Sequence, residues 1–216
     1  MDFFKSTLLG FAICILISSC GNENDADTEI KKQEVPVVEK KITDTTSFAN
    51  NVTEFDLANG PVGVYHVPEM LVLSITDSAQ TGQVSAVLQR NFATLEEEMV
   101  AVGAEVNGPI GMITYNNSLK NFKFESTLFI KRIPTVQPKR CNIVVLEASQ
   151  MLVYNFYGPY SNLFAAYDKI KKYCEKNDLI ESGPMREFYI TDPEKEKDPA
   201  KWLTRIMLPV ISMRKK

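Results

Sequence analysis

The segment GPMREFYITDP, residues 183–193, combines side chains that could bind or act on a small molecule. It reads as a strand between turn formers, with Glu187 inside an aromatic run and Tyr189 two residues later. Side chains alternate across a strand, so Glu187 and Tyr189 share one face while Phe188 and Ile190 share the other. A carboxylate among aromatic rings can balance a cationic ligand. Partial burial would also raise its pKa and make it a candidate general acid or base.

Two stretches of the chain each predict a strand, a helix and two further strands. Short apolar runs between turn formers indicate the strands, and apolar residues at spacings of three and four indicate the helices. The first stretch predicts strands at 70–76, 111–116 and 124–133 and a helix at 84–104. The second predicts strands at 151–157, 186–192 and 202–210 and a helix at 160–179.

These two stretches also align with each other. An offset of 75 residues pairs 88–136 with 163–211 without a gap, and the Gly-Pro turn and the strand-ending proline fall in register. We therefore expect an internal duplication, with repeat one at about 67–138 and repeat two at about 147–213. The predicted class is α+β: two β-α-β-β repeats form one antiparallel sheet, with the helices on one face and a ligand groove on the other. Burying Phe188 under the helices would aim Glu187 and Tyr189 into that groove.

The first twenty residues predict where the protein goes. Lys5 precedes an apolar run that is too short to span a membrane, and the run ends in the small residues of ISSC. This pattern resembles a bacterial lipobox, which implies a signal peptide at 1–19 and a lipid anchor on Cys20. Residues 20–60 hold nine acidic and four basic residues without periodicity, so we expect a disordered acidic tether before a domain at 61–216. The resemblance places the protein in the cell envelope, at the outer membrane.

Composition and motifs exclude several functions. Residues 61–216 hold seventeen acidic and nineteen basic residues, which argues against a nucleic-acid partner. The one histidine, His66, stands alone, so no metal site is expected. Phosphate-cradling glycine loops and the G-x-S-x-G motif are absent from the sequence, and we expect no cofactor. Cys141 and Cys174 could pair in an oxidising compartment, and the sequence leaves this open.

Three segments together resemble the gyrase-inhibitor-like (GyrI-like) small-molecule-binding family, which includes effector-binding domains of bacterial transcription regulators. They are FYGPYSNLFAAYDKIKKY, GPMREFYITDP and WLTRIMLPV, within a resemblance over roughly 67–213. It implies a two-repeat sheet whose groove binds small, often cationic and aromatic, molecules, with the strand glutamate, Glu187 here, facing the ligand. Some members are hydrolases that use the same glutamate with tyrosines. Two positions depart from the family pattern. The position of Phe156 is often a histidine in the family, and the position of Arg205 is commonly a glutamate. Arg205 could pair with Glu187.

The predicted ligand site combines these observations. Its residues are Glu187, Tyr189, Tyr115, Phe156, Tyr157 and Trp202. Tyr115 joins the site only if a bulge shifts its strand by one residue, and Tyr154, Tyr167 and Phe188 are expected in the core. Three functions stay open: an envelope protein that binds a cationic or aromatic molecule, a hydrolase of small electrophilic compounds with Glu187 and Tyr189 as catalytic residues, and a protein-interaction module.

Overall fold

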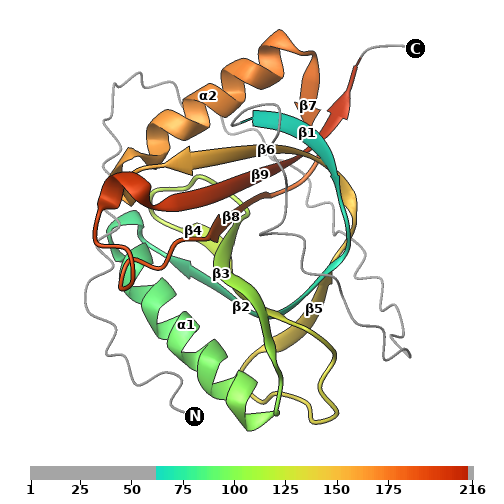
Figure 1. The fold of residues 1–216 in the computed structure, drawn as a ribbon, viewed down its shortest axis with the longest axis vertical. Coiled ribbons are helices and arrows are strands. Elements are labelled where there is room, and N and C mark those ends of the chain that lie inside the picture. Colours follow the sequence, from blue (N-terminus) through green and yellow to red (C-terminus); the bar gives the residue numbers. More distant parts are fainter. Residues whose placement is uncertain (1–61, 214–216) are drawn as a thin grey trace.

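The apolar runs of the sequence form nine strands and two α-helices in a computed structural model, which describes residues 62–213 (Figure 1). The strands are β1 (Val62–Val67), β2 (Met70–Ala79), β3 (Val106–Thr114), β4 (Phe122–Ile130), β5 (Asn142–Leu146), β6 (Ser149–Tyr157), β7 (Leu179–Glu181), β8 (Met185–Tyr189) and β9 (Leu203–Ser212). The helices are α1 (Val84–Ala101) and α2 (Leu163–Lys176), each entered through a 3₁₀ turn, at Thr81–Gln83 and Tyr160–Asn162. Every predicted strand and helix is present, with ends shifted by a few residues.

All strand pairs are antiparallel, and the sheet order is β1-β6-β9-β8-β3-β4-β2-β5, with β7 beside β9. The strands of the first half, β2, β4 and β3, are neighbours, as are β6, β9 and β8 of the second half. The two halves meet where β3 pairs with β8. The predicted α+β class is confirmed. That the halves arose by duplication stays a prediction.

Three strands, β1, β5 and β7, lie outside the predicted elements. β1 leads into β2 but pairs with β6, and β5 leads into β6 but pairs with β2. The first strand of each half therefore pairs with the other half and forms an edge of the sheet. The short β7 follows α2 and pairs with the end of β9.

Both helices pack on one face of the sheet, here called the helix face (Figure 1). α1 contacts β2 and β4, whereas α2 contacts β6 and β7. The predicted apolar stripe of α1 is buried at Val84, Leu88, Phe92 and Leu95. The helices thus cover the two ends of the sheet, and the central strands β8 and β3 lie between them.

The opposite face of the sheet has an apolar cluster of its own, which includes Val72, Met151 and Met207. The rings of Phe129 and Phe188 meet there edge to face, with centroids 4.9 Å apart. Gly111 of β3 pairs with Phe188, and a Cβ atom at this glycine would lie 2.4 Å from the Phe188 ring. A glycine is therefore required for the ring to lie across β3.

Hydrogen bonds join the segment between β4 and β5 to α1. Buried Glu98 accepts hydrogen bonds from the backbone N–H of Lys139 at 2.6 Å and from Nε of Arg140 at 2.7 Å. These bonds lower the pKa of Glu98, so the carboxylate stays ionised where it holds the segment. Cys141 and Cys174 are free thiols. Of the two described helices, neither is long and apolar enough to cross a membrane.

We predict that Gly111→Ala lowers the free energy of unfolding by about 3 kcal/mol, because the new methyl group overpacks a contact with ring and backbone atoms. Urea denaturation measures the change. Gly82→Ala is the matched control, since a Cβ atom there meets nothing within 4 Å. Equal stability of the two variants would contradict the role given to Gly111.

Candidate ligand-binding site

Glu187 lies in the middle of the sheet, on β8, paired with Met112 of β3 and Ile206 of β9. Its side chain points to the helix face, where the hydroxyl of Tyr167 on α2 donates to Oε1 at 2.7 Å. Oε2 has no hydrogen-bond partner among the described residues, and Glu187 is 1 % exposed. A carboxyl group with one unpartnered oxygen is thus enclosed between the sheet and α2.

The expected assignment of the two faces of β8 is wrong. Phe188 was expected under the helices, but it lies in the apolar cluster of the opposite face. Glu187 and Tyr189 were expected to face away from the helices, but Tyr167 of α2 holds the first and Phe92 of α1 packs against the second. The reason is that both faces of this sheet are apolar, so burial of Phe188 did not require the helices.

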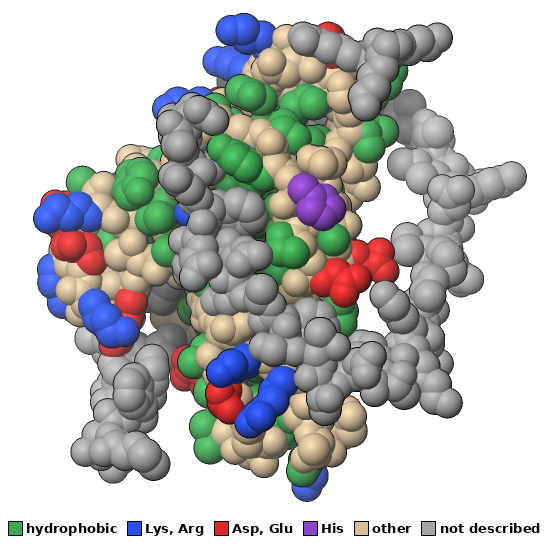
Figure 2. Space-filling model, turned by 45° about the vertical axis from the view of Figure 1, so that its right-hand side comes forward, with side chains coloured by type: hydrophobic (Ala, Val, Ile, Leu, Met, Phe, Trp, Pro, Cys, Tyr) green, Lys and Arg blue, Asp and Glu red, His purple; other side chains and the backbone are tan. Residues whose placement is uncertain are grey.

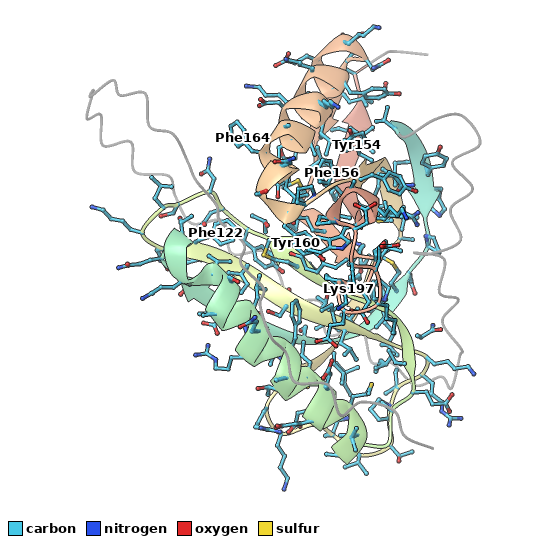
Figure 3. The ribbon with its side chains drawn as sticks, turned by 60° about the vertical axis from the view of Figure 1, so that its left-hand side comes forward. Phe122, Tyr154, Phe156, Tyr160, Phe164 and Lys197 are labelled. Atoms are coloured by element: carbon cyan, nitrogen blue, oxygen red, sulfur yellow. The ribbon has the colours of Figure 1, made fainter. Side chains whose placement is uncertain are left out.

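Aromatic rings form a continuous row beside Glu187. Tyr189 lies edge to face with Phe92, centroids 6.4 Å apart, and with Tyr160, centroids 5.4 Å apart. The ring centroids of Tyr160 and Trp202 are 5.2 Å apart. Nε1 of Trp202 donates to the carbonyl oxygen of Glu196 at 2.8 Å. Figure 3 shows Tyr160 between the two helices, with Phe156 on the α2 side. The row therefore spans the interval between α1 and α2.

Burial sets the protonation of this cluster. It raises the pKa of Glu187 to about 7, while the hydrogen bond from Tyr167 acts in the opposite direction. Burial, together with the neighbouring Glu187 carboxyl, raises the pKa values of Tyr167 and Tyr189 well above their ordinary range. The phenols thus keep their protons and can act as hydrogen-bond donors, whereas Glu187 can change charge near neutral pH.

The nearest arginines in sequence face away from Glu187. Arg205 pairs with Phe188 across the strands, and its Nε donates to Oδ1 of Asn155 at 2.8 Å on the opposite face. Arg186 also points to that face, where it interacts with Tyr115 and Glu125. Among residues 62–213, Glu187 forms no ion pair with a lysine, arginine or histidine. The sequence left open whether Arg205 pairs with Glu187, and in this structure the two side chains lie on opposite faces.

The structure brings four of the six predicted site residues to the helix face. Glu187 and Tyr189 are joined there by Phe156 and Trp202, which pack partly buried against the same core. Tyr115 lies on the opposite face, where its hydroxyl donates to Oε2 of Glu125. The sixth, Tyr157, is 61 % exposed. Their roles as ligand contacts stay predictions.

Sequence reasoning missed three aromatic residues that contact the cluster. Tyr160 lies in the segment FYGPYSNLFAAYDKIKKY, which resembles the family, but it was not assigned a role. Phe92 and Tyr167 belong to the apolar stripes of their helices, and spacing cannot distinguish a core position from one that touches Glu187.

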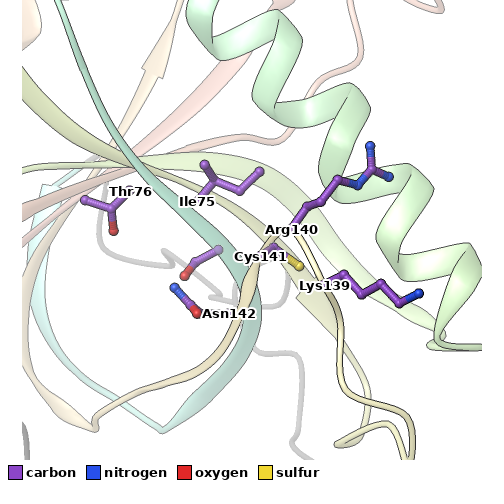
Figure 4. A pocket seen from close by; sticks show the side chains of 7 residues that line it. Ile75, Thr76, Lys139, Arg140, Cys141 and Asn142 are labelled. Atoms are coloured by element: carbon purple, nitrogen blue, oxygen red, sulfur yellow. The ribbon is translucent and has the colours of Figure 1, made fainter.

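Two hollows occur elsewhere on the surface. One of about 270 Å³ lies between β2 and the start of β5, lined by residues 74–76 and 139–142 (Figure 4). The other, of about 460 Å³, includes Val64 of β1 and Ile211 of β9. Figure 2 shows one side of the molecule, on which hydrophobic side chains lie among polar and charged ones. Neither hollow includes Glu187, and the burial of this side chain shows that the carboxyl site is closed. Within residues 62–213, no group of three or more His, Cys, Asp or Glu side chains could hold a metal ion.

Comparison with known proteins gives one family and several related folds. Residues 62–211 match the family model described as the GyrI-like small molecule binding domain. The C-terminal domain of EcmrR has a TM-score of 0.64 at 20 % identity, covering 70 % of this chain and 98 % of that domain. EcmrR in a complex with DNA has a TM-score of 0.63 at 21 % identity, and the match covers 70 % of this chain and 57 % of that chain. A hydrolase from Listeria innocua has a TM-score of 0.55 at 17 % identity, and the match covers 77 % of this chain and 100 % of that chain. At these identities the structures establish a shared fold only. No curated protein is significantly similar to the chain in sequence.

We predict that Glu187 makes the fold less stable as pH rises. Its pKa in the folded chain, about 7, exceeds its ordinary value of 4.5, so the folded state holds the proton more tightly and loses stability as pH increases through this window. Relative to Glu187→Gln, the wild-type free energy of unfolding should fall by about 3 kcal/mol between pH 4 and pH 8. Urea denaturation across this range measures it. Glu181→Gln, at an exposed carboxyl on β7, is the control, and parallel curves for wild type and Glu187→Gln would refute the assignment.

Proposed function

We propose, since this chain belongs to the GyrI-like small molecule binding domain family, that it binds a small aromatic organic cation at Glu187 as a lipid-anchored protein of the bacterial cell envelope. The observation that carries the ligand class is the buried Glu187 carboxyl, which within residues 62–213 has one unpartnered oxygen and no cation beside it. A bound cation would pair with the ionised form of this carboxyl.

The surroundings of Glu187 favour a cation with aromatic or apolar groups. Tyr189 interacts with the carboxyl, and its ring contacts Tyr160, which in turn contacts Trp202. Each aromatic ring face that a cation reaches attracts its charge by about 0.5–2 kcal/mol, most where water is excluded. A strongly hydrated inorganic ion would lose its water without gaining the oxygen ligands that replace it. An organic cation loses less hydration and also buries apolar surface.

Binding requires the site to open. Glu187 is covered by Tyr167 from α2, and Tyr160 enters from the turn that precedes this helix. A ligand that contacts Oε2 must therefore displace side chains of this segment. The energy for the displacement would come from burying the ligand and pairing its charge.

Hydrolysis of a small electrophile is the second candidate function. A carboxyl group with a pKa of about 7 suits a general base near neutral pH, and protonated tyrosines can donate to a developing negative charge. In this alternative Glu187 activates water and Tyr189 stabilises the leaving group. A protein-interaction module is the third candidate, and a nucleic-acid partner is not part of any of them.

We predict that the full chain gains thermal stability with N-benzylquinolinium, a permanent aromatic cation, because a ligand that binds only the folded state raises the midpoint of unfolding. The uncharged 1-benzylnaphthalene, of nearly the same shape, should give a smaller shift. Glu187→Gln should remove most of the difference between the two compounds, whereas Glu181→Gln should keep it. Turnover of a strained electrophile such as styrene oxide, lost in Glu187→Gln, would select the hydrolase instead. Flat responses to all compounds would favour the interaction module.

We predict that Cys20→Ser abolishes membrane attachment, because the thiol of Cys20 is the expected site of lipidation in the lipobox-like sequence. The measurement is detergent phase partitioning of the chain expressed in a bacterium that processes lipoproteins. Ser19→Ala, which keeps the cysteine and a small residue before it, is the control. Equal partitioning of the Cys20→Ser variant and wild type would contradict the anchor.

A further inference from the structure

Among the described residues, no charged side chain influences Glu187. α2 contributes Tyr167 and β8 contributes Tyr189, whose ring packs against Tyr160 from the 3₁₀ turn before α2. The strands on either side contribute Met112 and Ile206, and α1 contributes Phe92 through its contact with Tyr189. The charged side chains of β8 and β9, Arg186 and Arg205, lie on the opposite face.

An ionised carboxylate in such a place would have one hydrogen bond and neither water nor a counter-ion. Burial of an unpaired charge costs far more than burial of the neutral acid, so the group takes up a proton instead. Oε1 accepts from Tyr167, which leaves the partnerless Oε2 as the atom that carries the proton. The closed site therefore contains a neutral carboxylic acid.

We infer that the site works by exchange, in which one lipophilic monocation enters and one proton leaves Glu187 for the solvent. The inference rests on the proposed ligand-binding function and adds its stoichiometry. The O–H bond of the acid breaks, the electron pair stays on Oε2, and the carboxylate then balances the ligand without a covalent bond. The net charge of the enclosed site is zero before and after exchange, because one positive charge replaces another.

The exchange selects ligands by charge as well as by shape. A monocation is neutralised by the carboxylate, whereas a dication would leave one charge buried without a partner. A neutral aromatic molecule can enter without releasing the proton. The apparent affinity for the cation therefore depends on pH, whereas the affinity for a neutral molecule of the same shape does not.

The pH window follows from the position of the carboxyl. With a pKa of about 7, each unit of pH below neutrality should weaken cation binding about tenfold, and the dependence should flatten above about pH 8. Tyr167 acts as a positioning residue, because its hydroxyl stabilises the ionised form of Glu187. Tyr167→Phe should move the bend of the binding curve to higher pH.

The test is calorimetric titration of the full chain with N-benzylquinolinium at pH 6, in two buffers whose heats of ionisation differ. We expect release of close to one proton per bound cation, none on binding of 1-benzylnaphthalene, and a Kd for the cation about tenfold weaker at pH 5 than at pH 6. Glu187→Gln should abolish both the proton release and the pH dependence, and Glu181→Gln should keep them.

The outcomes separate this inference from the proposed function. Cation binding without proton release, and with a constant Kd, would overturn the exchange and leave the binding function standing. Absence of cation binding even at pH 8 would overturn both. A readout without ligand is the ¹³C resonance of the Glu187 side-chain carboxyl, identified by its absence in Glu187→Gln. Its titration near pH 4 instead of near neutrality would also overturn the exchange.

Discussion

The pairing of β3 with β8 is the constraint on which the site depends. These strands join the two halves at the centre of the sheet, and among the described strands the halves also pair through the edge strands β1 and β5. The join is close because Gly111 leaves room for the ring of Phe188. It places Glu187 far from either edge, opposite Met112, where water does not reach it. The burial that raises the pKa of this carboxyl is therefore a property of the whole sheet and not of one strand.

The sheet also separates charges that are adjacent in sequence. Arg186 and Glu187 follow one another on β8, but alternation sends their side chains to opposite faces. Arg186 lies near Tyr115 and Glu125 on the opposite face, and Glu187 lies among tyrosines under α2. The backbone layer thus prevents the ion pair that proximity in sequence would suggest. Glu187 therefore has no ion-pair partner among the described residues, although an arginine precedes it in sequence.

The sequence predicted the helices and strands better than it predicted which side chains lie on the helix face of the sheet. Apolar spacing identified α1, α2 and six strands, because those segments have apolar runs with turn formers at their ends. β1, β5 and β7 were missed, and each pairs with a strand that does not follow it directly in sequence. Alternation correctly grouped Glu187 with Tyr189, but it could not show which group faces the helices when both faces have apolar cores. Tyr115 fell on the opposite face because the register shift of β3 lies between Val106 and Ile110, and the pairing from Ile110 to Thr114 is regular.

The pairing of edge strands across the halves affects folding during synthesis. β1 is synthesised before the other described strands, but its partner β6 belongs to the second half. β1 therefore stays unpaired while α1 and β2 to β5 are synthesised. Pairing over such sequence distances is slow because much of the chain must be brought together first. A ribosome that stalls before β6 would leave β1 with an open row of backbone donors and acceptors, a template for pairing with another nascent chain.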